Sequence, residues 1–345
     1  MQAARVFGPR DLRYGVYPDP VLRSDEVLVR VRAAGICATD VEIYRGDMPY
    51  FTRHVAAYPI NPGHEWAGEV EAVGADVTSF VPGEHVVGEC SLGCRACAMC
   101  LSGRYHLCPY RQETGILNRD GAFAELLGFP AAFLHRVDRA LSFEEACLVE
   151  PSAVAANVVR RTAITPRDTV AVVGAGPIGL LTLQMARVSG ATRVILIDPR
   201  QERLAVGKLL GADATLHPCE LDGQTAVQDI VGDGCSVVIE ATGHPAAVPL
   251  AFNLVAVSGR IGMVGIFSGN QTNIDLDKIV TGDITVIGSL GSPQMWPSVI
   301  ELLQDRRIQV RPIISHILPL VDIGAAFAMI ERGASELLKI IVQPN

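Results

Sequence analysis

Four cysteines crowd into one short stretch of the chain, with spacings that suit a single metal ion. They follow the pattern Cys94-x2-Cys97-x2-Cys100-x7-Cys108. A structural zinc ion binds four thiolates in a tetrahedron, and short spacings let one loop wrap the ion without further scaffolding. Because four sulfurs leave no open position for a substrate, residues 90–108 are predicted to form a structural zinc loop. The alternative is four free thiols.

Donors of mixed type stand in three other segments: Cys37, the pair His64-Glu65, and Glu150. A sulfur, an imidazole and a carboxylate form a set typical of a zinc ion that keeps one position open for water or substrate. Taken singly, a cysteine after a strand is more often part of a core, and a His-Glu pair more often faces solvent. Their occurrence beside the cysteine loop and a dinucleotide motif favours a catalytic zinc site, where the metal would lower the pKa of a bound alcohol.

The dinucleotide motif is the glycine-rich turn Gly174-Ala175-Gly176-Pro177-Ile178-Gly179, which follows the apolar run 170–173 and opens a helical segment. In that context the first glycine allows a tight turn and the second lets the backbone approach a pyrophosphate. The third lets the helix pack closely on the strand. Free N–H groups at the helix N-terminus then face the phosphate charge.

Asp198 ends the next predicted strand, 22 residues after Gly176. A carboxylate at this place accepts hydrogen bonds from the ribose hydroxyls and repels a 2′-phosphate, which favours NAD over NADP. Arg200 and Arg203 lie close by in the sequence and weaken that preference. The alternative is a plain glycine turn followed by a surface aspartate.

The elements that would position these residues change in kind along the chain. Roughly the first 150 residues have mostly strand character with irregular loops. From Thr169 onward strand and helix patterns alternate, which predicts a parallel sheet with crossover helices. Near the C-terminus two more helices and a final strand are expected. The predicted strands are 170–173, 193–197, 237–239, 260–264, 284–287 and 339–342, and the predicted helices are 180–188, 201–210, 297–304 and 325–330.

These motifs, in this order, closely resemble the zinc-containing medium-chain alcohol dehydrogenase superfamily. The resemblance covers essentially the whole chain. It implies an α/β protein in which a GroES-like β-rich catalytic domain is interrupted by a Rossmann domain with a doubly wound parallel sheet. The implied bounds are 1–152 plus 295–345 for the catalytic domain and 153–294 for the Rossmann domain. The segments that carry the resemblance are 35–40, 63–68, 94–108, 150–151, 174–179, 198 and 239–243.

The resemblance also implies roles for single residues at the catalytic zinc. Cys37 and His64 resemble the family's zinc ligands. Glu65 and Glu150 resemble the carboxylates that complete or exchange in that shell. Asp40 corresponds to the acid that orients the ligand histidine, a usual arrangement at such sites.

Thr39 corresponds to the hydroxyl that relays the substrate proton. The implied activity is hydride transfer between a secondary alcohol and NAD. One catalytic and one structural zinc ion are expected per chain, in a homodimer or homotetramer. The implied cofactor contacts are Gly174, Gly176, Pro177, Ile178, Gly179, Asp198, Arg203, Val264 and Ser289.

Within the superfamily the chain resembles the polyol and threonine dehydrogenase branch, but it departs from that pattern near the substrate. Polyol dehydrogenases place a His-Tyr pair where this chain has Glu42-Ile43, and an Arg-Tyr pair where it aligns Gly291-Ser292. Threonine dehydrogenases have a histidine at the position of Glu42. Sorbitol and threonine are therefore not the expected substrates.

Glu42 is the informative difference. A carboxylate near the substrate can accept hydrogen bonds from several hydroxyls or pair with an ammonium group. Residues 58–68 resemble aminocyclitol dehydrogenases, and we therefore hypothesise a cyclitol, aminocyclitol or related polyol as substrate. The alternatives are that Glu42 only faces solvent, or that the substrate is L-threonine or another secondary alcohol.

Composition argues against several other classes. The net charge of −8 and the lack of a Lys/Arg cluster argue against nucleic-acid or membrane-surface binding. The N-terminus lacks the apolar run of a signal peptide, and the longest apolar stretch, 170–186, is broken by glycine and proline. We expect a cytoplasmic protein whose nine cysteines are thiols or metal ligands. A non-catalytic NAD-binding sensor would lack the zinc donors, and a zinc-free quinone reductase would lack the cysteine loop.

Overall fold

The computed structural model describes residues 1–221, 231–334 and 336–344, and the chain divides into two compact units. The second unit is inserted into the first along the chain, and it includes a late segment that lies beyond the expected boundary at residue 294. The first unit comprises Met1–Ala153, Gly291–Asp305 and Ile314–Asn345, and the second comprises Val154–Leu290 and Arg306–Ile313.

The second unit is built on a six-stranded parallel sheet with the strand order β12-β11-β10-β13-β14-β15. Counted along the chain, this is the order 3-2-1-4-5-6 of doubly wound dinucleotide-binding folds. The strands are β10 (Thr169–Val173), β11 (Arg193–Ile197), β12 (Ala214–Leu216), β13 (Cys235–Glu240), β14 (Val255–Met263) and β15 (Thr285–Gly288). The helices are α6 (Pro177–Val188), α7 (Gln201–Leu209), α9 (Ala247–Leu254) and α10 (Asp277–Thr281), with one-turn helices η3 (Pro218–Leu221) and η4 (Arg311–Ile313).

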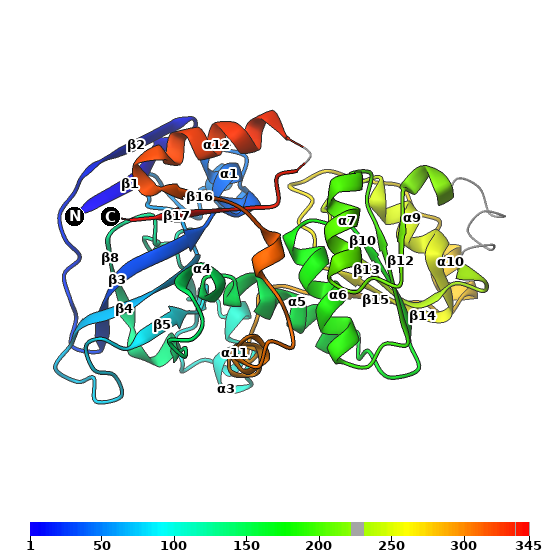
Figure 1. Cartoon of the computed structure of the whole chain (residues 1–345), viewed down its shortest axis with the longest axis horizontal. Helices are drawn as coiled ribbons and strands as arrows, with labels where there is room; N and C mark the ends of the chain where they lie inside the picture. Colours follow the sequence, from blue (N-terminus) through cyan, green and yellow to red (C-terminus); the bar gives the residue numbers. More distant parts are fainter. Residues whose placement is uncertain (222–230, 335, 345) are drawn as a thin grey trace. The chain divides into compact units, whose positions relative to one another are not determined.

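Alternate side chains of the central strands serve the two faces of this sheet, because successive residues of a strand point in opposite directions. On one face Leu196 fills the space left by Gly207 of α7, where a Cβ would collide with the leucine side chain. On the other face Ile195 belongs to the buried cluster formed with α9. Figure 1 shows α6 and α7 lying along the sheet. The predicted helix 180–188 begins one turn earlier, since Pro177 is accepted in a first helical turn.

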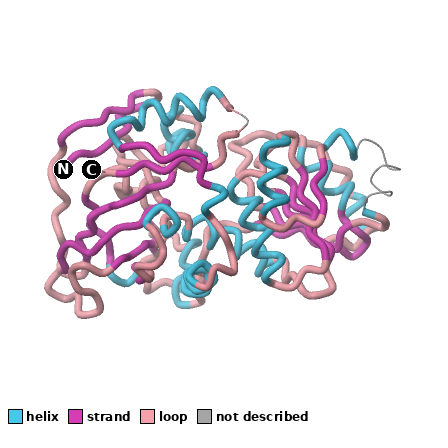
Figure 2. The backbone as a smooth tube through the Cα atoms, viewed as in Figure 1, coloured by secondary structure: helices cyan, strands magenta, loops and turns pink. Residues whose placement is uncertain are grey.

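The first unit is mostly antiparallel β structure, and Figure 2 shows its strands in magenta. Its main sheet has the order β16-β17-β3-β4-β5-β9, and β8 also pairs with β3. In β3, Val27, Val29 and Val31 point into the core while Arg30 and Arg32 are half-exposed, which is the alternation expected of a strand with one buried face. The strands are β1 (Gln2–Gly8), β2 (Asp11–Val16), β3 (Glu26–Gly35), β4 (Glu65–Val73), β5 (His85–Gly88), β6 (Ser91–Leu92), β7 (Gln112–Glu113), β8 (Leu126–Pro130), β9 (Leu134–Arg136), β16 (Ile314–Pro319) and β17 (Lys339–Gln343).

Short helices connect these strands. The longest is α5, which carries the chain across the boundary between the two units. The helices are α1 (Ala38–Arg45), α2 (Pro49–Thr52), α3 (Ala98–Leu101), α4 (Phe143–Ala146), α5 (Val149–Arg161), α11 (Trp296–Gln304) and α12 (Ile323–Arg332), with one-turn helices η1 (Tyr105–Leu107), η2 (Ala131–Phe133) and η5 (Leu320–Asp322). No helix in the described part of the chain is both long and apolar enough to cross a membrane.

Candidate metal centres and cofactor site

The four cysteines of the loop converge on one point. Sγ of Cys100 lies 3.9 Å from Sγ of Cys94 and 3.6 Å from Sγ of Cys97. Sγ of Cys97 lies 3.7 Å from Sγ of Cys108. A tetrahedron of sulfurs about 2.3 Å from a zinc ion has edges of roughly 3.8 Å. The four side chains therefore fit a closed, tetrahedral zinc site.

Backbone amides stabilise negative charge on these sulfurs. The amides of Cys94 and Tyr110 donate to Sγ of Cys108 at 3.4 and 3.3 Å. Hydrogen bonds from the backbone of Ala96 and Cys97 lower the pKa of the Cys94 thiol to about 6. The thiolate is the form that binds metal, and these amides favour it at Cys94, whereas burial raises the pKa of the Cys100 thiol to about 12.

Replacing Cys100 by serine should cost the protein one of its zinc ions and at least about 3 kcal/mol of stability, because structural zinc binding contributes directly to folding. Elemental analysis and urea unfolding would measure the two effects. The exposed thiol of Cys219 lies outside the cluster, so Cys219→Ser is the matched control. Full zinc content and an unchanged unfolding midpoint for Cys100→Ser would contradict the assignment.

A second group of donors lies at the end of β3 and the start of β4. Cys37, His64 and Glu65 bring one sulfur, one nitrogen and one oxygen within 4.8 Å of one another. Cys37 is the N-cap of α1 directly after β3, and the pairing of Gly35 with Glu65 brings the two segments together. His64 and Glu65 are buried, while Cys37 is partly accessible. This donor set suits a zinc ion that keeps a position for substrate.

Asp40 connects the two segments that carry these donors. Its Oδ2 accepts a hydrogen bond from the Cys37 amide at 2.8 Å, and its Oδ1 accepts one from the Gly63 amide at 3.0 Å. Oδ1 also lies 3.5 Å from Nδ1 of His64. Burial lowers the pKa of His64, but the charges of Asp40 and Cys37 outweigh it and raise that pKa well above its usual value. The fully buried Asp40 carboxylate thus faces the imidazole without a hydrogen bond to it, and its role in orienting a ligand histidine stays a prediction.

Lys339 is the residue of this site that sequence reasoning missed. Its Nζ lies 2.7 Å from both carboxylate oxygens of Glu65 and donates to the Ile36 carbonyl at 3.1 Å. Both side chains are buried. Burial lowers the pKa of Lys339, but the negative charge of Glu65 outweighs burial and raises the pKa above its usual value. The lysine therefore stays protonated. No local signal marks this lysine, because it stands on the last strand of the chain.

Glu150, the other carboxylate expected at the zinc, is not a member of the three-donor group. It is buried at the start of α5. Burial raises the pKa of Glu150 to about 7. The negative charge of Glu65 adds to this rise, and the positive charge of His64 opposes it. The carboxylate is therefore near the centre but outside the distance at which the other three donors meet.

Thr39 and Glu42 stand on α1, whose N-cap is Cys37. Oγ1 of Thr39 lies 3.9 Å from Sγ of Cys37, which places the hydroxyl beside the donor group. Glu42 follows one turn later, and residues three apart lie on the same side of a helix. Both side chains are partly exposed. Contact of Glu42 with a substrate stays a prediction.

In the second unit the glycine-rich turn has the backbone that the motif requires. Gly174 has a φ of +106°, a conformation that favours glycine. A Cβ on Gly179 would collide with the carbonyl oxygen of Gly174. Gly176 is the N-cap of α6, and a Cβ built there would meet only the guanidinium of Arg203, at 3.7 Å. With Pro177 in the first turn, the start of α6 offers its free amides to a phosphate.

Asp198 directly follows β11 and is tied to the glycine-rich turn. Its Oδ2 accepts a hydrogen bond from the Ala175 amide at 2.7 Å, and its Oδ1 accepts one from the Arg200 amide at 2.8 Å. The side chain is 94% buried by these contacts, since only 6% of the residue is exposed. A carboxylate oxygen can accept more than one hydrogen bond, so ribose hydroxyls can still bind there.

The other predicted cofactor residues lie at the same edge of the sheet. Val264 directly follows β14 and Ser289 directly follows β15, as Asp198 follows β11. The carboxyl ends of parallel strands share one edge, which is where doubly wound folds bind ligands. Ile178 stands in the first turn of α6, and the Arg203 guanidinium approaches that turn.

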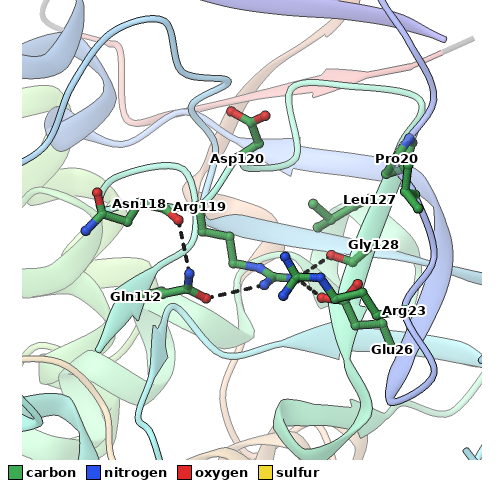
Figure 3. Close-up of a pocket in the computed structure, with 10 residues that line it drawn as sticks. Pro20, Arg23, Glu26, Gln112, Asn118, Arg119, Asp120, Leu127 and Gly128 are labelled. Carbon is green, nitrogen blue, oxygen red and sulfur yellow. Dashed lines mark hydrogen bonds and ion pairs between the residues drawn. The ribbon is translucent and has the colours of Figure 1, made fainter. Parts of the chain in front are cut away.

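A pocket of about 270 Å³ on the first unit is separate from these centres (Figure 3). Its Arg119 donates to Glu26 at 2.8 Å, to the Gly128 carbonyl at 2.6 Å and to Gln112 at 3.5 Å. None of the predicted metal or cofactor residues lines it. The arginine's charge is satisfied by its own neighbours, and the pocket is not the candidate site.

Comparison with known proteins covers both units. A family model described as an alcohol dehydrogenase GroES-like domain matches residues 23–139, and one described as a zinc-binding dehydrogenase matches residues 177–305. The chain is 32% identical to sorbitol dehydrogenase of Bacillus subtilis (strain 168) over 346 residues, covering 100% of this chain and 98% of that protein. It is 34% identical to L-threonine 3-dehydrogenase of Bacillus licheniformis over 324 residues, covering 93% and 92%.

A solved structure, 2R,3R-butanediol dehydrogenase from Bacillus subtilis, matches with a TM-score of 0.89 and 28% identity, covering 100% of this chain and 99% of that one. The expected fold class, a GroES-like part with an inserted Rossmann part, is confirmed. The chain therefore belongs to the zinc-containing medium-chain dehydrogenase family, in its polyol and threonine dehydrogenase branch, and is an oxidoreductase that acts on alcohols.

Proposed function

We propose that this protein transfers hydride between a secondary alcohol of a cyclitol, aminocyclitol or related polyol and NAD. The observation that carries the proposal is the group of Cys37, His64 and Glu65, in which three kinds of donor meet beside a partly exposed hydroxyl. A zinc ion held there supplies a Lewis acid that lowers the pKa of the substrate hydroxyl. NAD supplies the hydride acceptor, and its chemistry belongs to the cofactor.

The chain's own residues prepare that reaction. Cys37 and His64 would hold the metal, and Asp40 would orient the imidazole. Thr39 would accept the proton of the substrate hydroxyl and pass its own proton onward; the 3.9 Å distance between its Oγ1 and the Cys37 sulfur supports this role. Lys339 neutralises Glu65, so the carboxylate does not repel an electron-rich substrate oxygen.

The proposal is tested by zinc content and substrate range together. The purified protein should contain about two zinc ions per chain, one of them outside the cysteine loop. A turnover panel of inositols, aminocyclitols, hexitols, L-threonine and primary alcohols should show activity on inositols, aminocyclitols or a hexitol other than sorbitol. Zinc bound only in the cysteine loop, or activity on simple primary alcohols alone, would contradict the proposal. Preference for L-threonine would favour the activity of the Bacillus licheniformis relative instead.

Asp198→Ala should lower kcat/KM with NAD about tenfold to a hundredfold and raise the relative use of NADP. A charged hydrogen bond contributes about 1.5–3 kcal/mol, and the same carboxylate repels a 2′-phosphate. Steady-state kinetics with each cofactor would measure the ratio, and the exposed Asp305→Ala is the control. An unchanged ratio of the two cofactors would contradict the assignment of Asp198.

We further infer that the protein is a homodimer or homotetramer in the cytoplasm, where thiolate sites persist. The edge strand β15 supports self-association, because its backbone is unpaired on one side and Val286 and Leu290 are 44% and 42% exposed. Light scattering should give at least two chains per particle, and Val286→Glu should reduce that number. A monomeric wild-type protein would contradict this inference.

A further inference from the structure

A cluster of three polar side chains in the first unit has no part in the metal and cofactor sites described above. Nε of Arg111 donates to Oε1 of Glu113 at 2.6 Å, and NH2 of Arg111 donates to the Tyr50 hydroxyl at 2.7 Å. The Tyr50 hydroxyl also lies 3.4 Å from Oε1 of Glu113. We call these residues the Glu113 cluster. Only 7% of Glu113 is exposed, so its charge is largely enclosed.

The backbone places this cluster next to the segment that carries His64. Residues 113–117 form a tight turn, in which the amides of Glu113 and Leu117 bond each other's carbonyl groups. At the centre of the turn, a Cβ on Gly115 would lie 2.7 Å from the Gly63 amide nitrogen. Gly63 in turn donates to Asp40, the residue that faces the His64 imidazole. The turn therefore packs directly on the backbone beside the candidate metal ligand.

A partly buried cysteine, Cys90, lies near both the cluster and the metal donors. The amide of Thr114 donates to the Cys90 carbonyl at 2.9 Å. Burial raises the pKa of the Cys90 thiol well above its usual value, and Glu113 and Cys37 act in the same direction. His64 and Glu150 act on that thiol as well. Glu113, Cys37 and His64 are therefore all near enough to Cys90 for their charges to act on its thiol.

Buried apolar side chains pack between the 113–117 turn and α1. The turn contributes two residues and α1 contributes one to a buried cluster, against which Tyr50 packs. Ile43, the member from α1, stands next to Glu42 on the helix that also carries Thr39. The members are Ile43, Met48, Phe51, Ala56, Ile60, Ile116 and Leu117. The Glu113 cluster is therefore the polar part of a mainly apolar wall beside the candidate centre.

One carboxylate oxygen of Glu113, Oε2, can accept a further hydrogen bond. The hydrogen bonds from Arg111 and Tyr50 both reach Oε1, and within the described part of the chain Oε2 accepts none. Oε2 is also absent from the fully enclosed polar atoms. The neighbouring Gln112 belongs to the other side of the strand, since it lines the surface pocket of Figure 3. Glu113 therefore faces away from that surface pocket, and its Oε2 is an acceptor that is not fully enclosed.

The cluster selects a hydrogen-bond donor rather than an anion. The positive charge of Arg111 is already matched by Glu113, and its NH1 donates to the Cys108 carbonyl at 3.4 Å. A carboxylate or phosphate on the substrate would meet the carboxylate of Glu113. A hydroxyl, by contrast, can donate to Oε2, and a hydrogen bond to a charged acceptor is stronger than a neutral one.

Resting on the proposed function, we propose that Glu113 is a specificity-determining residue that accepts a hydrogen bond from a hydroxyl remote from the reacting carbon of a polyol. Arg111 and Tyr50 are positioning residues that hold its carboxylate. Substrates with a single hydroxyl reach the metal centre but make no contact with Glu113.

The test compares Glu113→Gln with Glu26→Gln in the zinc-loaded enzyme. Glu26 is the matched control, because it is also a buried carboxylate paired with an arginine, Arg119. Unlike Glu113, it stands on β3 and lines the surface pocket of Figure 3. The probes are 2-butanol and whichever of sorbitol, xylitol, erythritol and myo-inositol the wild type oxidises fastest. Glu113→Gln should lower kcat/KM for the polyol about tenfold to a hundredfold, mainly through KM, and change that for 2-butanol less than about twofold.

Tyr50→Phe should give a smaller change of the same kind, and Glu26→Gln should leave the ratio of the two substrates unchanged. An equal loss for polyol and 2-butanol in Glu113→Gln, or no loss for either, overturns the subsite while leaving the proposed function intact. A wild-type enzyme that oxidises neither these alcohols nor any aminocyclitol overturns the proposed function and the subsite with it. Unfolding midpoints of the variants identify any loss that comes from misfolding.

Discussion

Cys37→Ser is expected to lower kcat at least about a thousandfold and to remove one of the two zinc ions. Serine replaces the sulfur donor with a neutral hydroxyl that holds zinc poorly at neutral pH. A thousandfold loss corresponds to about 4 kcal/mol of transition-state stabilisation, which is of the size that a Lewis acid supplies at a developing oxyanion. Steady-state kinetics and elemental analysis of the same preparation would measure both effects.

The matched control for this variant is Cys147→Ser. Cys147 is fully buried in the same unit, and its thiol donates to the Glu144 carbonyl, a bond that a serine hydroxyl can keep. The control should retain both zinc ions and most of its activity. Turnover that survives in Cys37→Ser, or zinc content that does not change, would mean that the three-donor group is not the catalytic centre.

Lys339→Met is expected to destabilise the protein by about 3–5 kcal/mol, the largest stability effect of any single change considered for this chain. The substitution would leave the carboxylate of Glu65 buried without the cation that lies 2.7 Å from both of its oxygens. Breaking a buried ion pair from one side is costly because the remaining charge is neither solvated nor paired. Urea unfolding of the zinc-loaded protein would measure the loss.

A double-mutant cycle separates the charge from the packing. Glu65→Gln combined with Lys339→Met should recover much of the stability, because no buried charge is left unpaired. Lys339→Arg keeps the charge and serves as the conservative control. If Lys339→Met costs no more than a surface substitution, or if the double variant is as unstable as the sum of the two single changes, Lys339 does not neutralise Glu65.

Activity gives the same cycle a second readout. In Lys339→Met the released carboxylate of Glu65 can bind a metal ion more firmly and compete with the substrate for its position. The expected result is a fall in kcat that Glu65→Gln partly reverses. A purely structural role of the lysine would lower stability without this reversal.

Several features of the protein could be predicted from local sequence because local geometry carries them. The cysteine loop holds its four donors within fifteen residues, so the spacing alone brings them together, and the structure places the sulfurs at tetrahedral distances. The glycine-rich turn likewise combines strand, turn and helix in one stretch, and Gly174 and Gly179 have the conformations and contacts that the motif demands. The run of aliphatic residues in β10 predicted a central strand because such a strand is buried on both faces.

The tertiary structure alone decided which distant residues complete the candidate metal centre. Cys37, His64 and Glu65 could be grouped by donor type and by the motifs beside them, but they meet because β3 and β4 pair in one register. Lys339 lies 274 positions from the glutamate it neutralises, and no spacing rule reaches that far. No sequence motif marks Glu113, which is only 7% exposed and precedes a turn whose Gly115 packs on the Gly63 backbone. The physical reason is common to all three: local pattern sets secondary structure and short loops, whereas the pairing of strands and the packing of their ends determine which buried charges come into contact.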